Sequence, residues 1–520
     1  MRTFSKHAVS ILLTLTMLVS MVIVPSVMQV AAADPTMAGD VDGDGKISST
    51  DALEVLKAVV GKVTFTQAQK TYSDVDADGK LAAADALTIL KKVVGKIDKF
   101  PLEDKLNAGP SEPITITLAT VAEDETAGKD YTGDHATGML WKEQFAQMQA
   151  NNITTVVTPL SLKDTVDTIK TNALAGTSPA DVYELSLAAC RALAKENVSL
   201  NLYKSNTLKK DLFANAATES MTHYDRAFGV SFATKAANPM GVIYNKQLIA
   251  QYAPDYDIAK LYADGQWTFA KFQEIANACI QDTDGDGKTD IYGFTSNTDV
   301  IGMALTSNAG ATALKVDEKV EATMCNDKGI AALNWCKDLF STDKSWLYKP
   351  AINTCIGEFQ QGHAAMFVSY LQFLPQLATG TEFEMGFVQM PMGPDQDKYI
   401  TGVYDATMFA VPTDKRDRLD DIGYWLNAMA GASDALVEHQ VNGLKASRLD
   451  DDGIATYRKL VNGMSANFST GVFSQNTSSA VDSSVTAAAK KPDKVIPNLR
   501  ETAQKECDDY FATIYTYDPQ

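Results

Sequence analysis

The stretch from residue 40 to residue 51 reads Asp40-Val41-Asp42-Gly43-Asp44-Gly45-Lys46-Ile47-Ser48-Ser49-Thr50-Asp51, and it returns as Asp74-Val75-Asp76-Ala77-Asp78-Gly79-Lys80-Leu81-Ala82-Ala83-Ala84-Asp85. Both copies place aspartate at loop positions 1, 3, 5 and 12, glycine at position 6 and an aliphatic residue at position 8. A helical pattern follows each copy, because apolar residues such as Leu53, Leu56 and Val60 recur at helical spacing. The repeat therefore predicts two copies of one loop–helix unit.

The two loops have the chemistry of a site for a hard divalent cation. Ca2+ takes about six to eight oxygen ligands, and the loop around it bends sharply at the sixth residue. The predicted ligands are Asp40, Asp42, Asp44, the Lys46 carbonyl, Ser48 and Asp51 in the first loop, and Asp74, Asp76, Asp78, the Lys80 carbonyl and Asp85 in the second. Ala82 has no side-chain oxygen, so the second site is expected to use an extra water. The alternative is a pair of solvated acidic loops without metal, which the repeat disfavours.

The arrangement of the two units resembles a known module. Neither unit has the entering helix of a complete EF-hand, and a calcium loop with one exiting helix, duplicated after a spacer, resembles the type I dockerin of cellulosomal proteins. The resemblance implies that Ca2+ folds residues 34–98 and that one helix docks on a cohesin domain of a scaffold protein. The positions it implies for cohesin contact are Ser49, Thr50, Leu53 and Lys57 in the first repeat and Ala83, Ala84, Leu87 and Lys91 in the second. Since the pairs at loop positions 10 and 11 differ, the two faces are not expected to be equivalent.

Residues 1–33 have the pattern of a secretory signal peptide. Arg2 and Lys6 precede an apolar run over residues 11–24, and Ala31-Ala32-Ala33 offers small residues for cleavage. An uncleaved membrane anchor is the alternative, which the short apolar run disfavours. The first cysteine is Cys190, so no thiol near the predicted mature N-terminus can receive a lipid. We therefore predict a secreted, extracellular protein without a lipid anchor, held at a cell surface or cellulosome by the dockerin.

Charge and cysteine usage narrow the functional classes. The formal net charge is −19, and no basic patch of useful size is visible, which disfavours nucleic-acid binding. The six cysteines are widely spread, so one or two disulfides and free buried thiols are both compatible with the sequence. The five histidines lie far apart and form no zinc-ligand pattern.

A second, larger domain follows a short linker over residues 99–112. Alternating strands over residues 114–120 and 153–158 are separated by a helical pattern, and a second helix over residues 162–175 leads to a third strand near residues 181–185. This strand–helix order predicts a parallel sheet with crossover helices over the start of residues 113–520.

Five stretches in this region resemble, in order, motifs of the extracellular solute-binding proteins of ABC importers (family 1). They are Ala175-Gly176-Thr177-Ser178-Pro179-Ala180-Asp181-Val182, Gly241-Val242-Ile243-Tyr244-Asn245-Lys246, Trp267-Thr268-Phe269, Phe359-Gln360-Gln361-Gly362-His363-Ala364-Ala365-Met366 and Met390-Pro391-Met392-Gly393-Pro394. Ala180 interrupts the first motif. The resemblance implies an α/β fold of two lobes around a cleft, with crossings near residues 230–243 and 395–412. It also implies a small solute as ligand and an ABC importer permease as a possible partner.

A third acidic loop lies inside the large domain, over residues 282–293. Its predicted ligands are Asp282, Asp284, Asp286, the Lys288 carbonyl and Asp290. Gly293 occupies position 12, so the usual bidentate carboxylate is missing and Asp290 is a candidate replacement. The sequence favours a third Ca2+ here, with an ion-free acidic hairpin as the alternative.

Solute contacts are sought among aromatic and polar neighbours on loops at strand ends, because sugar sites combine aromatic faces with hydroxyl acceptors. The candidates are Tyr131, Asp134, Trp141, His223, Tyr224, Asp225, Tyr404 and Asp405. Each is alternatively a packed core residue or a solvated loop residue.

Dockerin-bearing chains are often polysaccharide-degrading enzymes, so a glycoside hydrolase is the competing interpretation. It would need two carboxylates across a cleft, one with a raised pKa, and spacing in sequence does not exclude such a pair. No nucleophile elbow, Ser-x-x-Lys or His-Glu-x-x-His pattern is visible. We therefore predict a non-enzymatic protein: a small all-α Ca2+ dockerin followed by a two-lobed α/β domain that captures an oligosaccharide.

Overall fold

The computed structural model describes residues 37–65, 67–102, 109–122, 131, 136–161, 165–223, 225–232, 239–316, 319–402, 406–461 and 472–516. The chain divides into two compact units, residues 1–108 and residues 109–520. The predicted signal peptide and part of the predicted linker lie outside the described residues. None of the helices in the described part of the chain combines the length and the apolar character needed to cross a bilayer.

The first unit is helical, as predicted. It contains α2 (Ser49–Val59), α3 (Gln67–Ser73) and α4 (Ala83–Val93). The Ser48 hydroxyl accepts a hydrogen bond from the Thr50 amide, and the Asp51 carboxylate accepts one from the Ser48 amide, so a capping box starts α2. In the second repeat Asp85 still accepts from the Ala82 amide at 2.8 Å, but Ala82 has no hydroxyl to cap α4.

The core of the first unit follows the sequence repeat. Helices α2 and α4 pack together and bury Ala52 and Val55 of the first repeat opposite Ala86 and Ile89 of the second. The buried cluster also contains Ala38, Val41, Phe65, Val75, Phe100 and Leu102. Each repeat therefore supplies one half of a core that it could not close alone.

The second unit begins with a four-stranded sheet in the order β13-β3-β1-β2. Its strands are β1 (Ile114–Ala122), β2 (Ile153–Ser161), β3 (Val182–Ser186) and β13 (Thr407–Ala410). Strand β1 pairs in parallel with β2 and with β3, while β13 is antiparallel to β3. The predicted parallel sheet with crossover helices is confirmed, and we call this sheet and its helices lobe 1.

Lobe 2 is built on a five-stranded sheet in the order β10-β7-β11-β6-β12. Its strands are β6 (Met240–Asn245), β7 (Tyr292–Ser296), β10 (Trp346–Tyr348), β11 (Ala364–Tyr370) and β12 (Met385–Gln389). Strand β6 runs antiparallel to its neighbours β11 and β12, whereas β7 is parallel to β10 and β11. Every residue of β11 is buried, as expected for a central strand covered on both faces.

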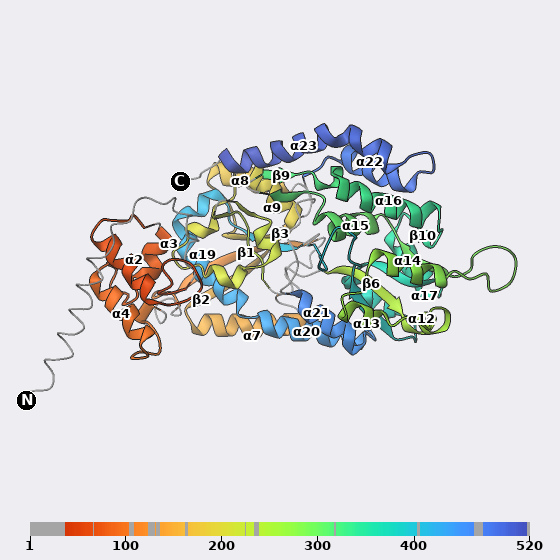
Figure 1. Ribbon diagram of the computed structural model, residues 1–520. Helices are drawn as coiled ribbons and strands as arrows, with labels where there is room; N and C mark the ends of the chain where they lie inside the picture. Colours follow the sequence, from red (N-terminus) through yellow and green to blue (C-terminus); the bar gives the residue numbers. More distant parts are fainter. Residues whose placement is uncertain are drawn as a thin grey trace, which may run out of the picture. The chain divides into compact units, whose positions relative to one another are not determined.

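Helices cover both sheets (Figure 1). Lobe 1 carries α7 (Ala136–Ala150), α8 (Thr165–Ala175), α9 (Leu187–Lys195), α10 (Ala216–Glu219) and α19 (Leu419–Ala430). Lobe 2 carries α12 (Lys246–Tyr252), α13 (Ile258–Ala263), α14 (Phe269–Ala278), α15 (Asp299–Ala309), α16 (Asp327–Ser341), α17 (Ile352–Gln360), α18 (Leu374–Ala378), α21 (Asp451–Val461) and α22 (Gln475–Thr486). Two short hairpins complete the second unit: β4 (Thr222–His223) with β5 (Arg226–Ala227), and β8 (Leu314–Val316) with β9 (Lys319–Glu321).

The chain passes between the lobes more than once. It leaves lobe 1 after Val230, which bridges to Phe409, and enters lobe 2 at Met240; it returns between Gln389 and Thr407. Helix α20 (Ser433–Ala446) forms a further crossing, because its first half joins the lobe 1 core and its second half joins the lobe 2 core.

Candidate functional site

The first loop of the dockerin gathers its carboxylates at one point. Oxygens of Asp40, Asp42 and Asp51 lie within 4.8 Å of one another, and Asp40 and Asp51 are buried. The Asp51 carboxylate also accepts hydrogen bonds from the Val41 amide at 2.6 Å and the Asp42 amide at 3.2 Å. The Gly45 amide donates to Asp40 at 2.9 Å, and its φ of 79° is the left-handed turn that the sixth position requires.

Electrostatics in this loop favour a bound cation. Burial raises the pKa of Asp40, and the nearby charges of Asp51 and Asp44 raise it further. Burial and the same neighbours raise the pKa of Asp42. Carboxylates crowded in this way repel one another unless a positive charge lies between them, and an all-oxygen donor set suits a hard ion such as Ca2+. The residues present therefore fit the metal that the sequence predicts.

The second loop repeats this geometry, with Ala77 and Ala82 in place of Gly43 and Ser48. Oxygens of Asp74, Asp76 and Asp85 lie within 4.8 Å of one another, and burial raises the pKa of Asp85. Ala77 takes a left-handed φ of 63° where the first loop has Gly43 at 71°. Such a conformation costs a residue with a Cβ about 1 kcal/mol or more. The second loop therefore holds more strain than the first and lacks the side-chain oxygen that Ser48 offers.

The aspartates at loop position 5 lie apart from the other carboxylates of the two loops. Asp44 and Asp78 lie outside the close groups of three, and each accepts a hydrogen bond from a backbone amide two residues later, at Lys46 and Lys80, at 2.8 Å. These bonds fix the turn of the backbone at Lys46 and Lys80. The roles of Asp44 and Asp78 as ligands stay predictions.

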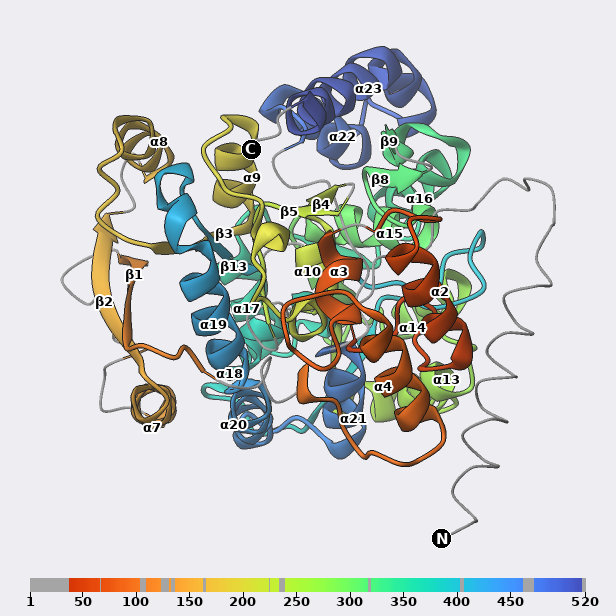
Figure 2. The same ribbon diagram turned by 90° about the vertical axis from the view of Figure 1, so that its left-hand side faces the viewer.

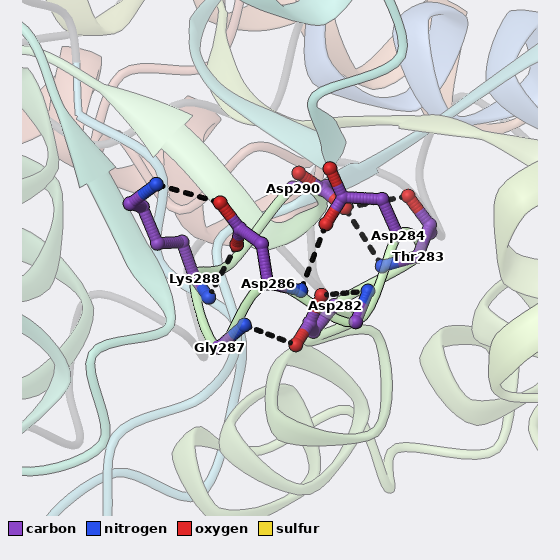
Figure 3. Close-up of polar contacts among 8 residues, drawn as sticks. Asp282, Thr283, Asp284, Asp286, Gly287, Lys288 and Asp290 are labelled. Carbon is purple, nitrogen blue, oxygen red and sulfur yellow. Dashed lines mark hydrogen bonds and ion pairs between the residues drawn. The ribbon is translucent and has the colours of Figure 1, made fainter.

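The third loop brings together Asp282, Asp284 and Asp290, whose carboxylate oxygens lie within 4.8 Å of one another (Figure 3). Asp286 lies apart from this group, because its carboxylate pairs with the Lys288 ammonium at 2.6 Å. Asp290 accepts from the Thr283 amide at 2.7 Å, much as Asp51 accepts from amides at the start of the first loop. Asp290 thus takes the structural part of the missing position-12 carboxylate.

Gly293 has a packing reason to be glycine. A Cβ at this position would lie 2.4 Å from the Ala276 carbonyl oxygen, so a carboxylate side chain cannot be placed there without moving α14 from β7. The loop therefore ends in tight helix–strand packing and takes its last carboxylate from Asp290.

The predicted cohesin-contact residues differ in exposure between the repeats. Ser49, Thr50, Ala83 and Ala84 are exposed at the starts of their helices. Leu87 is 50% exposed, whereas its counterpart Leu53 is half-buried. Lys57 is also half-buried and pairs with Glu54 at 2.7 Å, while Lys91 is exposed.

Two of the predicted solute contacts lie together, but inside the core of lobe 1. Tyr131 is 1% exposed and Trp141 has no exposed surface, with their ring centroids 5.0 Å apart. Trp141 also packs on Phe145 and Phe232. The indole therefore offers no face for stacking, which corrects the prediction that Trp141 faces a solute; it is a core residue because α7 directs it onto the sheet.

The other predicted solute contacts are not brought together by the described structure. Asp225 is exposed at the turn of the β4–β5 hairpin and pairs with Lys210 at 2.8 Å. His223 belongs to β4 of the same hairpin. Asp134, Tyr224, Tyr404 and Asp405 lie outside the described residues.

Polar residues that the sequence reasoning missed lie at the strand ends. Glu184, near the carboxyl end of β3, is 7% exposed and accepts a hydrogen bond from the Tyr131 hydroxyl at 2.7 Å. In lobe 2, Asp299 follows the end of β7 and accepts from the Ser369 hydroxyl of β11 at 3.0 Å. The carboxyl edge of parallel strands is where open α/β sheets place ligands.

A second lobe 2 carboxylate lies beside Asp299. Burial raises the pKa of Asp482 to about 6; the Thr298 hydroxyl opposes the rise by hydrogen bonding, and the charge of Asp299 adds to it. Tyr348, at the end of β10, lies near the same carboxylate. The sequence could have indicated Asp299, because it is a polar residue shortly after the buried strand β7. Asp482 gives no such signal, because it comes from α22, far away in the chain.

The comparisons with known proteins agree with this architecture. Residues 141–420 match the family model of the bacterial extracellular solute-binding proteins. The chain belongs to this family. Residues 38–94 match the dockerin type I domain, so this solute-binding protein carries a dockerin in front of its two-lobed fold.

Solved structures support the fold of the solute-binding protein. UspC of Mycobacterium tuberculosis has a TM-score of 0.55 at 17% identity, with 76% of this chain and 100% of UspC covered. The cyclic alpha-maltosyl-1,6-maltose binding protein of Arthrobacter globiformis has a TM-score of 0.55 at 15% identity, with 78% and 100% covered. An ABC substrate-binding protein of Listeria monocytogenes in complex with cycloalternan has a TM-score of 0.53 at 15% identity, with 76% and 99% covered. Among curated proteins, none matches this chain.

These findings bear on the predicted dockerin, the predicted fold and the predicted location of the protein. The dockerin and the two-lobed α/β fold are confirmed, and the dockerin together with the extracellular solute-binding domain indicates an extracellular protein. Type I dockerins bind Ca2+ and imply a cohesin partner. All six cysteines are free and buried, which answers the question of pairing in favour of thiols.

Proposed function

We propose that this solute-binding protein is secreted, attaches through its Ca2+-loaded dockerin to a cohesin of a scaffold protein, and captures an oligosaccharide between its two lobes. The observation that carries the proposal is the presence, in one chain, of two loops with converging carboxylates and a two-sheet solute-binding fold. Attachment would keep the solute-capturing domain beside enzymes that release oligosaccharides. Delivery to an ABC importer permease is a further step that family membership suggests.

We assign two Ca2+ ions to the dockerin and a third to residues 282–293. The support is that each of the three loops holds three carboxylates within 4.8 Å of one another. The third group is more exposed than the other two, so we expect it to bind its ion most weakly.

An oligosaccharide is the solute class that the chemistry favours. Glu184 near the end of β3 and Asp299 after β7 place carboxylates at the strand edges, and Asp482 of α22 lies beside Asp299. These carboxylates can accept hydrogen bonds from sugar hydroxyls. One structurally similar protein is in complex with cycloalternan and another is named for binding cyclic alpha-maltosyl-1,6-maltose, which supports this class.

One observation favours the competing function. Asp299 and Asp482 are neighbouring carboxylates, and the pKa of Asp482 is raised to about 6, as a glycoside hydrolase acid would require. Both residues belong to lobe 2, however, and the family consists of binding proteins. Product formation separates the two functions: a hydrolase releases new reducing ends from an oligosaccharide, and a binding protein returns it intact.

The experiment is a thermal-shift and calorimetry screen of the full-length protein with malto-, cello- and xylo-oligosaccharides. We expect one class to bind with a single site, and Asp299→Asn and Glu184→Gln to weaken that binding by roughly 10- to 100-fold, because a hydrogen bond to a charged group contributes about 1.5–3 kcal/mol. Asp264→Asn, at an exposed carboxylate after α13 that pairs with Lys260 in a surface ion pair, is the matched control and should bind like wild type. Failure of every oligosaccharide to bind would overturn the assigned solute class.

A parallel experiment tests attachment. Full-length protein is passed over immobilised cohesin domains with Ca2+ and again with EDTA. We expect retention by at least one cohesin with Ca2+ only, and absence of retention in both conditions would overturn the attachment step.

A further inference from the structure

The last helix of the chain contacts both lobes of the solute-binding domain. Helix α23 (Pro492–Thr516) packs against α16, α22 and β9 of lobe 2 and against α9 of lobe 1. Figure 1 shows α23 running from the region of α16 and α22 across to α9, and Figure 2 shows α22 and α23 next to α16 and β9. It is not one of the segments by which the backbone crosses between the lobes, so its contact with lobe 1 is an additional connection.

On lobe 2, α23 is held by directional hydrogen bonds. The Gln504 side-chain amide donates to the Val320 carbonyl at 2.8 Å and accepts from the Ala322 amide at 3.2 Å, which pairs it with the backbone just around β9. The Arg500 guanidinium donates to the Cys325 carbonyl at 2.9 Å. Such bonds fix both position and orientation.

Helix α22 strengthens this anchor. The Glu506 carboxylate accepts from the Ser474 amide at 3.2 Å and from the Thr477 hydroxyl at 3.0 Å, which ties α23 to the start of α22. At the other end of α22, the Lys337 ammonium of α16 donates to the Val485 and Ala487 carbonyls at 3.0 Å and 2.8 Å. The helix pair is therefore held on lobe 2 at several independent points.

The lobe 1 end of the contact lies around Tyr510. Ile496, Ala503, Cys507 and Tyr510 form one buried stripe along α23, within a core cluster that includes Leu187 and Cys190 of α9 as well as lobe 2 residues such as Cys325, which lies near Cys507. Tyr510 lies beside Cys190 and Arg191, since both influence the pKa of its phenol. Helix α9 is itself fixed to lobe 1, because the Leu187 amide donates to the Ala406 carbonyl directly before β13.

We propose that α23 is a strap anchored on lobe 2 that holds lobe 1 through Tyr510. A rotation of one lobe against the other must slide α9 past this end of the helix or detach it, because the directional bonds on lobe 2 keep α23 with that lobe. The strap thus limits how far the lobes separate. This inference concerns lobe geometry and stands whichever solute binds.

The test measures the distance between the lobes in the full-length protein. Spin labels are attached at Leu174→Cys in lobe 1 and Lys260→Cys in lobe 2, two exposed positions, while the six native thiols are buried. We expect Tyr510→Ala to broaden the distance distribution about twofold or more toward longer separations, because loss of the contact raises the population of open arrangements. Lys505→Ala, which alters an exposed side chain of the same helix, is the matched control and should leave the distribution unchanged.

Gln504→Ala keeps the test decisive if Tyr510→Ala does not fold. It removes only the pairing with the backbone around β9 and should broaden the distribution in the same direction by a smaller factor. Circular dichroism first establishes which variant folds. If Tyr510→Ala folds and shows the wild-type distance distribution, the strap is overturned. If Tyr510→Ala does not fold, a folded Gln504→Ala protein with the wild-type distribution overturns it instead.

Discussion

The two dockerin repeats have nearly the same sequence and the same helix, yet they differ at the left-handed turn and at the helix cap. The first has Gly43 at its left-handed turn and Ser48 as both helix cap and predicted ligand, while the second has Ala77 and Ala82 at these places. Both nevertheless keep the position-12 aspartate, which is fully buried and hydrogen-bonded to loop amides in each. The comparison teaches that this one carboxylate joins loop to helix in both repeats, whereas the turn residue and the helix cap differ between them.

The largest expected effect is that of calcium removal. With EDTA, we expect residues 37–102 to lose most of their helical signal, because the crowded carboxylates lose the charge that offsets them and metal binding is part of the folding energy of small metal-bound modules. The sheets of the solute-binding domain should remain. Circular dichroism with and without restored Ca2+ checks this, and an unchanged helical signal would show that neither repeat depends on its metal.

Substituting the position-12 aspartates should give the next largest effect. Asp51→Asn and Asp85→Asn each remove a ligand charge and weaken the bonds to loop amides, and we expect each to lower Ca2+ affinity at its own loop by on the order of 100-fold. Calorimetric titration of the two variants would separate the two sites. Equal loss at both sites from either variant would mean that the repeats bind as one unit.

A dependence on pH follows from the raised pKa values of Asp40, Asp42 and Asp85. In the metal-free unit, a folded-state pKa above the unfolded value means that the folded form binds protons more tightly. The contribution of these three groups to its stability is therefore fully present below the ordinary pKa of 3.8 and is lost as pH rises through the folded values. The Ca2+-loaded unit should show the opposite trend, because protons compete with the metal. Thermal unfolding across pH in EDTA and in Ca2+ measures both slopes.

The smallest effect sharpens the comparison between the repeats. Ala82→Ser should restore a helix cap and a ligand oxygen and stabilise the second repeat by about 1 kcal/mol, while Ser48→Ala should destabilise the first by about the same amount. Chemical unfolding in Ca2+ measures both variants. If Ala82→Ser left the unfolding midpoint unchanged, the missing hydroxyl would not be what distinguishes the repeats.

How much the sequence predicts depends on the range of the interactions involved. The dockerin and the parallel sheet of lobe 1 were predictable, because loop spacing and strand–helix alternation are local patterns. Trp141 was misassigned because the direction of a side chain on α7 depends on packing against Tyr131 and Phe232. Asp299 and Asp482 meet only through the fold, since 183 residues separate them in the chain. The packing of Gly293 on α14 likewise became visible only in three dimensions.

Helix α20 has a consequence for how the solute-binding domain denatures. Its first half contributes Leu436 to one hydrophobic core, next to Ala432 at the helix N-cap, and its second half contributes Val441 and Leu444 to the other. Melting of either core removes the surface on which half of the helix rests, and a helix of this length is marginal without tertiary support. Heat should therefore unfold the two lobes in a single calorimetric transition, so that a substitution that destabilises one lobe also lowers the unfolding temperature of the other.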